Sequence, residues 1–155
     1  SGRDLDTLSG FIDTGTIHDN NWVGYSQGAD VPDGSGVNGY IRWGGDNTGN
    51  GVEAILVNFK KMADDNPLLS LIKIQLNAFW YGTKGTGDVE VQLETYLGGT
   101  MIQQGYDFVN QGGSTVQSLI LSRNVVQNIQ SSNINTSTNV AFVTYNAADK
   151  TANIE

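Results

Sequence analysis

The sequence predicts an all-β protein, an antiparallel β-sandwich of the jelly-roll kind with about eight or nine strands. Three observations support this class. Apolar and polar residues alternate strictly over residues 71–81 and 89–97. Glycine is abundant, with 20 residues, while proline contributes only 2. Turn signals separate short apolar segments at regular spacing along the chain, as a sandwich requires.

Residues 71–97 carry the clearest strand signal. In the first arm one face is apolar, and its members are Ile72, Ile74, Leu76, Ala78 and Trp80. In the second arm Val89, Val91 and Leu93 alternate with Glu90, Gln92 and Glu94. A period of two indicates half-buried antiparallel strands, and the glycine-rich segment 82–87 predicts that the two arms form a hairpin.

The chain begins with a segment that we expect to be irregular. Residues 1–21 carry Asp4, Asp6, Asp13 and Asp19 among short apolar pieces, and aspartate is unfavourable in strands. We interpret residues 1–2 (Ser-Gly) as a pair left by tag cleavage. Residues 22–155 are then expected to form the β-sandwich domain.

The next predicted elements are short strands. Residues 22–26 and 37–43 read as strands separated by glycine and aspartate loops. Residues 52–62 are predicted as a strand because they are rich in Val and Ile and show no cap. A helix over 53–62 is the alternative, since Ala, Leu, Lys and Met favour it.

The second half of the chain continues the pattern. Residues 100–109 predict one or two short strands, and residues 115–126 predict a longer one. Residues 127–139 are polar and are expected to form a loop or a solvent-exposed strand. Residues 139–146 and 151–155 predict a terminal hairpin with an Asp-Lys turn.

Composition excludes some partners. The net charge is −8 and the pI about 4.3, which argues against nucleic acid and against adhesion to anionic membranes. No apolar run approaches the ~20 residues that span a bilayer, so no membrane insertion is expected. Cysteine is absent, so no disulfide is formed.

No catalytic motif is present, and we expect a protein that is not an enzyme. His18 is the single histidine and lacks a nucleophile motif, so a packing or surface role is expected. Glu90, Glu94 and Glu53 are conceivable acids for glycoside hydrolysis. Cross-strand pairing of the glutamates with Lys73 explains them more simply.

A sugar-binding surface is predicted around Tyr40. Tyr40 and Arg42 are expected on one strand face, beside the loop residues Asp46 and Asn47. A sugar ring stacks on an exposed phenol while charged and amide side chains hydrogen-bond its hydroxyls. These four residues are the candidate glycan ligands.

Calcium is the one cofactor that the loops suggest. Asp30 and Asp33, near Ser35, and the pair Asp46 and Asn47 supply oxygen atoms in glycine-rich loops. Calcium takes six to eight such oxygens, although the spacing differs from the EF-hand loop. Turn formation alone also accounts for these residues, so no cofactor is strictly required.

Three segments carry a family resemblance. They are residues 79–82 (Phe-Trp-Tyr-Gly), residues 91–101 and the closing residues 142–146. Over residues 37–155 the chain resembles β-sandwich domains of tailed-bacteriophage virion surface proteins, namely fibre, whisker and head-decoration proteins. The resemblance carries no fixed site pattern.

The resemblance implies a non-enzymatic structural domain on the virion surface, outside the cell. Such a domain would serve attachment or decoration as a homo-oligomer, typically a trimer. Its partners would be copies of itself, other virion proteins or a host-surface glycan, and display of many copies would give avidity. The alternative is a carbohydrate-binding module from a secreted polysaccharide-degrading system.

Overall fold

The computed structural model confirms the all-β, sandwich-like class. It describes residues 3–25, 39–49, 51–83, 85, 87–125, 128–129 and 132–155. In the described residues the strands are β1 (Asp4–Ile12), β2 (Ile41–Trp43), β3 (Ile55–Val57), β4 (Leu71–Tyr81), β5 (Val89–Leu97), β6 (Thr100–Gln104), β7 (Asp107–Gln111), β8 (Ser114–Arg123), β9 (Asn128–Ile129), β10 (Thr138–Asn146) and β11 (Thr151–Ile154). The helical elements are α1 (Phe59–Asp65) and the 3-10 turn η2 (Ile134–Thr136).

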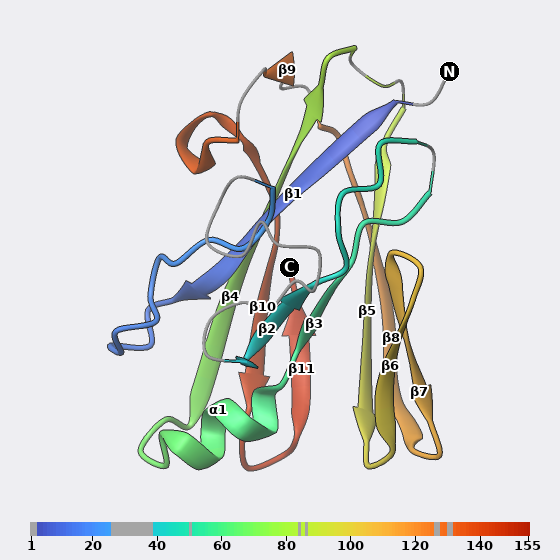
Figure 1. Cartoon of the computed structure of the whole chain (residues 1–155). Helices are drawn as coiled ribbons and strands as arrows, with labels where there is room; N and C mark the ends of the chain where they lie inside the picture. Colours follow the sequence, from blue (N-terminus) through green and yellow to red (C-terminus); the bar gives the residue numbers. More distant parts are fainter. Residues whose placement is uncertain are drawn as a thin grey trace.

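The main sheet has the order β1-β4-β10-β11, with β9 running parallel to the end of β4 (Figure 1). β4 lies inside the sheet, between β1 and β10, and both pairings are antiparallel. The predicted terminal hairpin is confirmed, because β10 pairs with β11. β1 is an edge strand, and this places its outer edge beside the loops that follow β2.

The expectation of an irregular lead-in over residues 1–21 is wrong for residues 4–12, whereas residues 13–21 form no regular strand or helix. Nine of these residues form β1, which pairs with β4 from Asp4 opposite Tyr81 to Ile12 opposite Lys73. The last seven residues of β1 are all buried. The burial of Leu8 and Phe11, both 0% exposed, outweighs the poor strand propensity of the aspartates.

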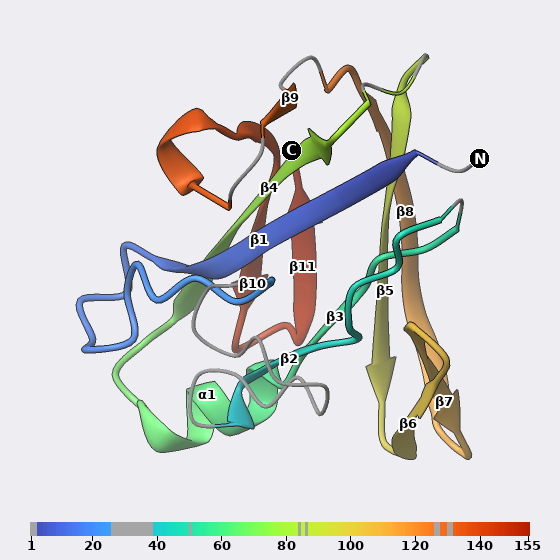
Figure 2. The ribbon, with the colours of Figure 1, turned by 45° about the horizontal axis from the view of Figure 1, so that its top comes forward.

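The expected hairpin between residues 71–81 and 89–97 is also not formed. Both edges of β4 are occupied by β1 and β10, so β5 crosses to a different sheet and pairs with β8. Figures 1 and 2 show β5 and β8 beside the main sheet, with the β6–β7 hairpin at their end. Lys73 consequently lies over the Phe142 ring, 4.5 Å from its centroid, and the expected pairing with Glu90 and Glu94 is absent.

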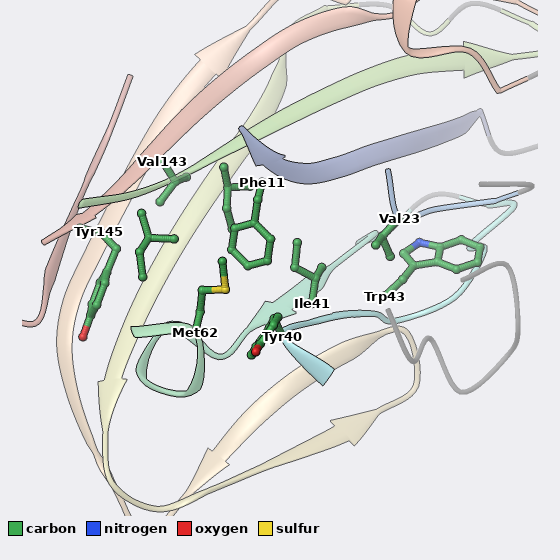
Figure 3. Close-up of a cluster of buried hydrophobic side chains, with 11 residues drawn as sticks. Phe11, Val23, Tyr40, Ile41, Trp43, Met62, Val143 and Tyr145 are labelled. Atoms are coloured by element: carbon green, nitrogen blue, oxygen red, sulfur yellow. The ribbon is translucent and has the colours of Figure 1, made fainter. Parts of the chain in front are cut away.

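The core lies between the main sheet and the elements that cover it. Its larger cluster joins β1, β4 and β10 to β2 and α1, as Figure 3 shows for Phe11, Ile41, Met62 and Val143. A second cluster joins the other part of the sheet to β5 and to residues beyond β8, around Trp80 and Val91. The Trp80 indole N–H donates to the Val125 carbonyl at 2.8 Å, which satisfies its buried polar atom.

The predicted strand over residues 52–62 is correct only for Ile55–Val57. β3 pairs antiparallel with β2, and α1 begins two residues after β3 ends. Asn58 caps this helix, because its side-chain oxygen accepts from the Lys61 backbone N–H at 3.0 Å. The helix buries Met62 against the core.

In the described residues 22–25, the predicted strand is reduced to isolated bridge positions at Val23 and Gly24. Val23 exchanges two backbone hydrogen bonds with Ser9, at 3.0 and 2.7 Å, and so covers part of the outer edge of β1. None of the helices in the described part of the chain is both long enough and apolar enough to cross a membrane.

Candidate functional site

Acidic side chains gather where β1 begins. Asp4 and Asp6 lie two residues apart on this strand, and Asp46 comes from the loop after β2. One carboxylate oxygen from each of the three lies within 4.8 Å of the others. Because successive side chains of a strand alternate, the spacing of two places Asp4 and Asp6 on the same face.

Glu53 joins this group from the loop before β3. Its Oε2 atom accepts from both the backbone N–H and the hydroxyl of Thr7, each at 2.8 Å. These hydrogen bonds hold the Glu53 carboxylate next to Asp6, because Asp6 directly precedes Thr7 in the chain. Asp4, Asp6, Asp46 and Glu53 are called the acid cluster from here on.

Each residue of the acid cluster holds one buried oxygen without a hydrogen-bond partner. These atoms are Asp4 Oδ1, Asp6 Oδ1, Asp46 Oδ1 and Glu53 Oε1. Asp6 is only 5% exposed. Buried polar atoms in folded proteins nearly always have a partner, so these four oxygens are candidates for binding a proton, a water molecule or a cation.

The carboxyl groups of the acid cluster have raised pKa values. Burial and the Asp4 and Asp46 charges raise the pKa of Asp6 to about 7. Burial, together with the Asp6 and Asp46 charges, raises the pKa of Glu53 to about 8, although the hydrogen bonds from Thr7 oppose the shift. The pKa values of Asp4 and Asp46 are also raised, chiefly by burial. Among the described residues, every charged group that contributes to these shifts is itself an acid.

A divalent cation fits this arrangement. Calcium binds carboxylate oxygens at 2.3–2.6 Å, so two oxygens on opposite sides of one ion lie about 5 Å apart. One oxygen each of Asp4, Asp6 and Asp46 lie within 4.8 Å of one another, which agrees with that span.

Tyr40 does not lie on an exposed face, contrary to the predicted sugar surface. Its ring is 5% exposed and belongs to the larger core cluster. Its hydroxyl donates to Asp65 at 2.5 Å, and the His18 ring packs edge-on at 5.1 Å between centroids. The ring precedes β2 and turns inward, so it cannot stack on a sugar. The contact also gives His18 the expected packing role.

The other three predicted glycan ligands are placed differently. Arg42 is exposed on β2, on the strand face opposite to Ile41 and Trp43. Asn47 stabilises its own loop, donating to the Val52 carbonyl at 3.1 Å and accepting from the Gly49 N–H at 3.2 Å. Asp46 belongs to the acid cluster. The four residues therefore do not form one surface.

Only part of the calcium prediction can be compared with the structure. Asp30 and Asp33 lie outside the described residues. Asp46, the third candidate oxygen ligand, lies among other carboxylates. The sequence does not predict that Glu53 joins this site, because Glu53 is 46 residues from its hydrogen-bond partner Thr7 along the chain. The one local signal was the Asp-x-Asp spacing of Asp4 and Asp6, which puts two acids on one strand face.

A pocket of about 300 Å³ adjoins the acid cluster. Asp46 lines it together with Trp43, Tyr25 and two residues of the β6–β7 hairpin and its turn, Gln103 and Tyr106. Glycines 44, 45 and 105 complete the lining. Asp46 is thus shared between the acid cluster and the pocket.

Comparison of the chain with models of known protein families, with curated proteins and with solved structures found no match.

Proposed function

We propose that this chain is a non-enzymatic β-sandwich module that binds a calcium ion at the acid cluster. The observation that carries the proposal is the set of four buried carboxylate oxygens without partners, among them that of Asp6. The ion would join the start of β1 to the loop that carries Asp46 and Glu53. It would therefore fasten the edge of the main sheet to the covering layer.

The choice of calcium follows from the ligand atoms. All four side chains offer carboxylate oxygen, whereas zinc prefers cysteine and histidine. Cysteine is absent from the sequence, and the single histidine packs against Tyr40. Magnesium demands a small octahedral shell and retains several waters, which suits a buried set of four acids poorly.

The energetic effect of the ion is large because the metal-free cluster is unfavourable. Burying carboxylates beside one another either costs free energy or forces them to retain protons. A divalent cation would offset two of the negative charges and would give the unpartnered oxygens a positive partner. Thr7 would hold Glu53 in place, as hydrogen-bonded outer residues do for many metal ligands.

Calorimetric titration with calcium chloride, after treatment with a chelator, tests the proposal. We expect a single site and a raised melting temperature. At calcium 100-fold above the dissociation constant, the added free energy of unfolding is about 2.7 kcal/mol. For a chain of this size that corresponds to about 5–10 °C.

Asp6→Asn and Asp149→Asn form a matched pair of variants. Both remove one aspartate charge, but Asp149 is exposed in the turn between β10 and β11, at the other end of the main sheet. Asp6→Asn should abolish the calcium effect, and Asp149→Asn should preserve it. Equal melting temperatures of the wild type in calcium and in chelator would contradict the proposal.

The wider role that we propose is structural or attachment display as an oligomer, in keeping with the resemblance to virion surface domains. Light scattering on the purified chain tests it, and a stable trimer is expected. Display as a trimer supports a virion role, whereas a strict monomer favours the carbohydrate-binding module. The pocket beside Asp46 is the observation that favours this second candidate.

A further inference from the structure

Apart from Tyr25, the residues that line the pocket beside the acid cluster come from two separate hairpins. Trp43 and Asp46 come from β2 and the loop that follows it, while Gln103 and Tyr106 come from the β6–β7 hairpin. The Gln103 side-chain amide joins the two, donating to the Gly44 carbonyl at 2.9 Å and to the Gly105 carbonyl at 3.0 Å. The walls of the pocket are therefore held together by a hydrogen-bonded side chain.

Glycine keeps these walls close. A Cβ atom on Gly44 would meet the Tyr106 carbonyl oxygen at 2.3 Å, which no side chain tolerates. Gly45 has φ of +101°, and the Tyr106 ring lies 3.5 Å from the place its Cβ would take. The loop carrying Asp46 thus runs directly along Tyr106.

The lining has the chemistry of a polyhydroxylated ligand. Two tyrosine side chains are exposed at the pocket, Tyr25 by 52% and Tyr106 by 46%. A carboxylate and an amide supply hydrogen-bonding groups, and no lysine or arginine is among the lining residues that the structure describes. Such a pocket favours an uncharged ligand with apolar C–H faces and hydroxyl groups, and disfavours an anion.

We propose that this pocket binds one neutral sugar residue of a saccharide, and that binding requires the cation. This inference rests on the proposed calcium site. The sugar ring would pack on Tyr106 or Tyr25, and its hydroxyls would hydrogen-bond Asp46 and Gln103. Calcium would act through Asp46, which belongs to both sites, by fixing the loop that forms one wall.

The test begins with an array of neutral and sialylated glycans, probed in calcium and in chelator. Calorimetric titration with the methyl glycosides of glucose, galactose, mannose and N-acetylglucosamine follows. We expect binding to neutral sugars in calcium and none in chelator. Tyr106→Ala should weaken binding about tenfold or more, as loss of a central aromatic contact does in other interfaces.

Two variants control for unrelated effects. Tyr106→Phe keeps the ring and should retain most of the affinity. Tyr81→Ala removes a tyrosine of similar exposure, 44%, that does not line the pocket, and should change nothing. Calcium-dependent melting, measured on every variant, reports the acid cluster independently of sugar.

The outcomes separate the two proposals. If calcium raises the melting temperature but no glycan binds, the sugar site is wrong and the calcium site stands. If sugar binds equally well in chelator, its dependence on the cation is wrong. Unchanged affinity in Tyr106→Ala would remove the site from this pocket, and a preference for sialylated glycans would overturn the neutral ligand.

Discussion

The two halves of β1 differ in what they offer the rest of the molecule. The second half presents Leu8 and Phe11, which are both fully buried, and Phe11 belongs to the larger apolar core cluster. The first half presents Asp4 and Asp6, whose buried oxygens lack partners. The apolar half makes its contacts within the folded chain, whereas the acidic half leaves oxygens that protons or, as we propose, a calcium ion would bind.

The comparison shows that one strand can combine apolar packing with an acidic site whose stability depends on pH and on ions. Both halves keep the same antiparallel register with β4, so the backbone pairing is continuous. The side chains decide the difference. Stability of the apolar half should be insensitive to ions and pH, whereas that of the acidic half should depend on both.

The largest effect is expected from the apolar half. Phe11→Ala should lower the free energy of unfolding by about 3–5 kcal/mol, because it leaves a cavity beside Tyr40. Denaturant unfolding in calcium and in chelator measures it. The loss should be the same in both, and a loss found only in calcium would mean that the two halves are not independent.

The pH dependence of the metal-free protein should be the next largest effect. The folded-state pKa values of Asp6, about 7, and Glu53, about 8, lie above their ordinary values of 3.8 and 4.5. The folded state therefore binds more protons than the unfolded state between about pH 4 and pH 8. This contribution to stability is complete below pH 4 and is lost as the pH rises to 8, by a few kcal/mol in total.

Melting curves in chelator from pH 5 to pH 8 measure this trend. With calcium the trend should weaken or reverse, because the ion competes with protons for the same oxygens. Asp6→Asn in chelator should flatten part of the slope. If the stability of the metal-free protein rose steadily with pH over this window, it would contradict the raised pKa values of Asp6 and Glu53.

A smaller effect is expected at the junction of the two halves. Thr7→Val keeps the shape of the side chain but removes the hydroxyl that donates to Glu53. The free energy of unfolding should fall by about 1 kcal/mol. Calcium affinity should fall about tenfold or more, as for other residues that orient a metal ligand.

Calorimetric titration of Thr7→Val with calcium chloride provides the measurement. The hydrogen bond from the Thr7 backbone N–H to Glu53 remains in this variant, so binding should be weakened rather than abolished. An unchanged calcium affinity would show that Glu53 does not need the hydroxyl for its placement.

The sequence predicted faces of strands better than partners of strands. Alternation in residues 71–81 identifies the buried face of β4, but it contains no information on which strand lies beside it. The occupied edges of β4 decided that β5 would pair elsewhere. In the same way, the helix α1 followed from its Asn58 cap, which the apolar pattern of residues 52–62 concealed.

The acid cluster was predictable only in part. Asp46 was recognisable as an oxygen ligand because it lies in a glycine-rich loop. Asp4 and Asp6 predict irregular backbone when each is considered alone, since aspartate is unfavourable in a strand. Their meaning depends on Glu53, which is close in space only after β1 has joined the sheet.

The hydrogen bond from the Thr7 backbone to Glu53 has a further consequence for self-association. An edge strand with open N–H groups is a template on which the strand of another molecule can add. Here the outer N–H of Thr7 is occupied by a carboxylate, and that of Ser9 by the Val23 carbonyl. The Glu53 side chain, which we propose as a calcium ligand, thus also blocks the addition of a strand from another molecule at this part of the β1 edge.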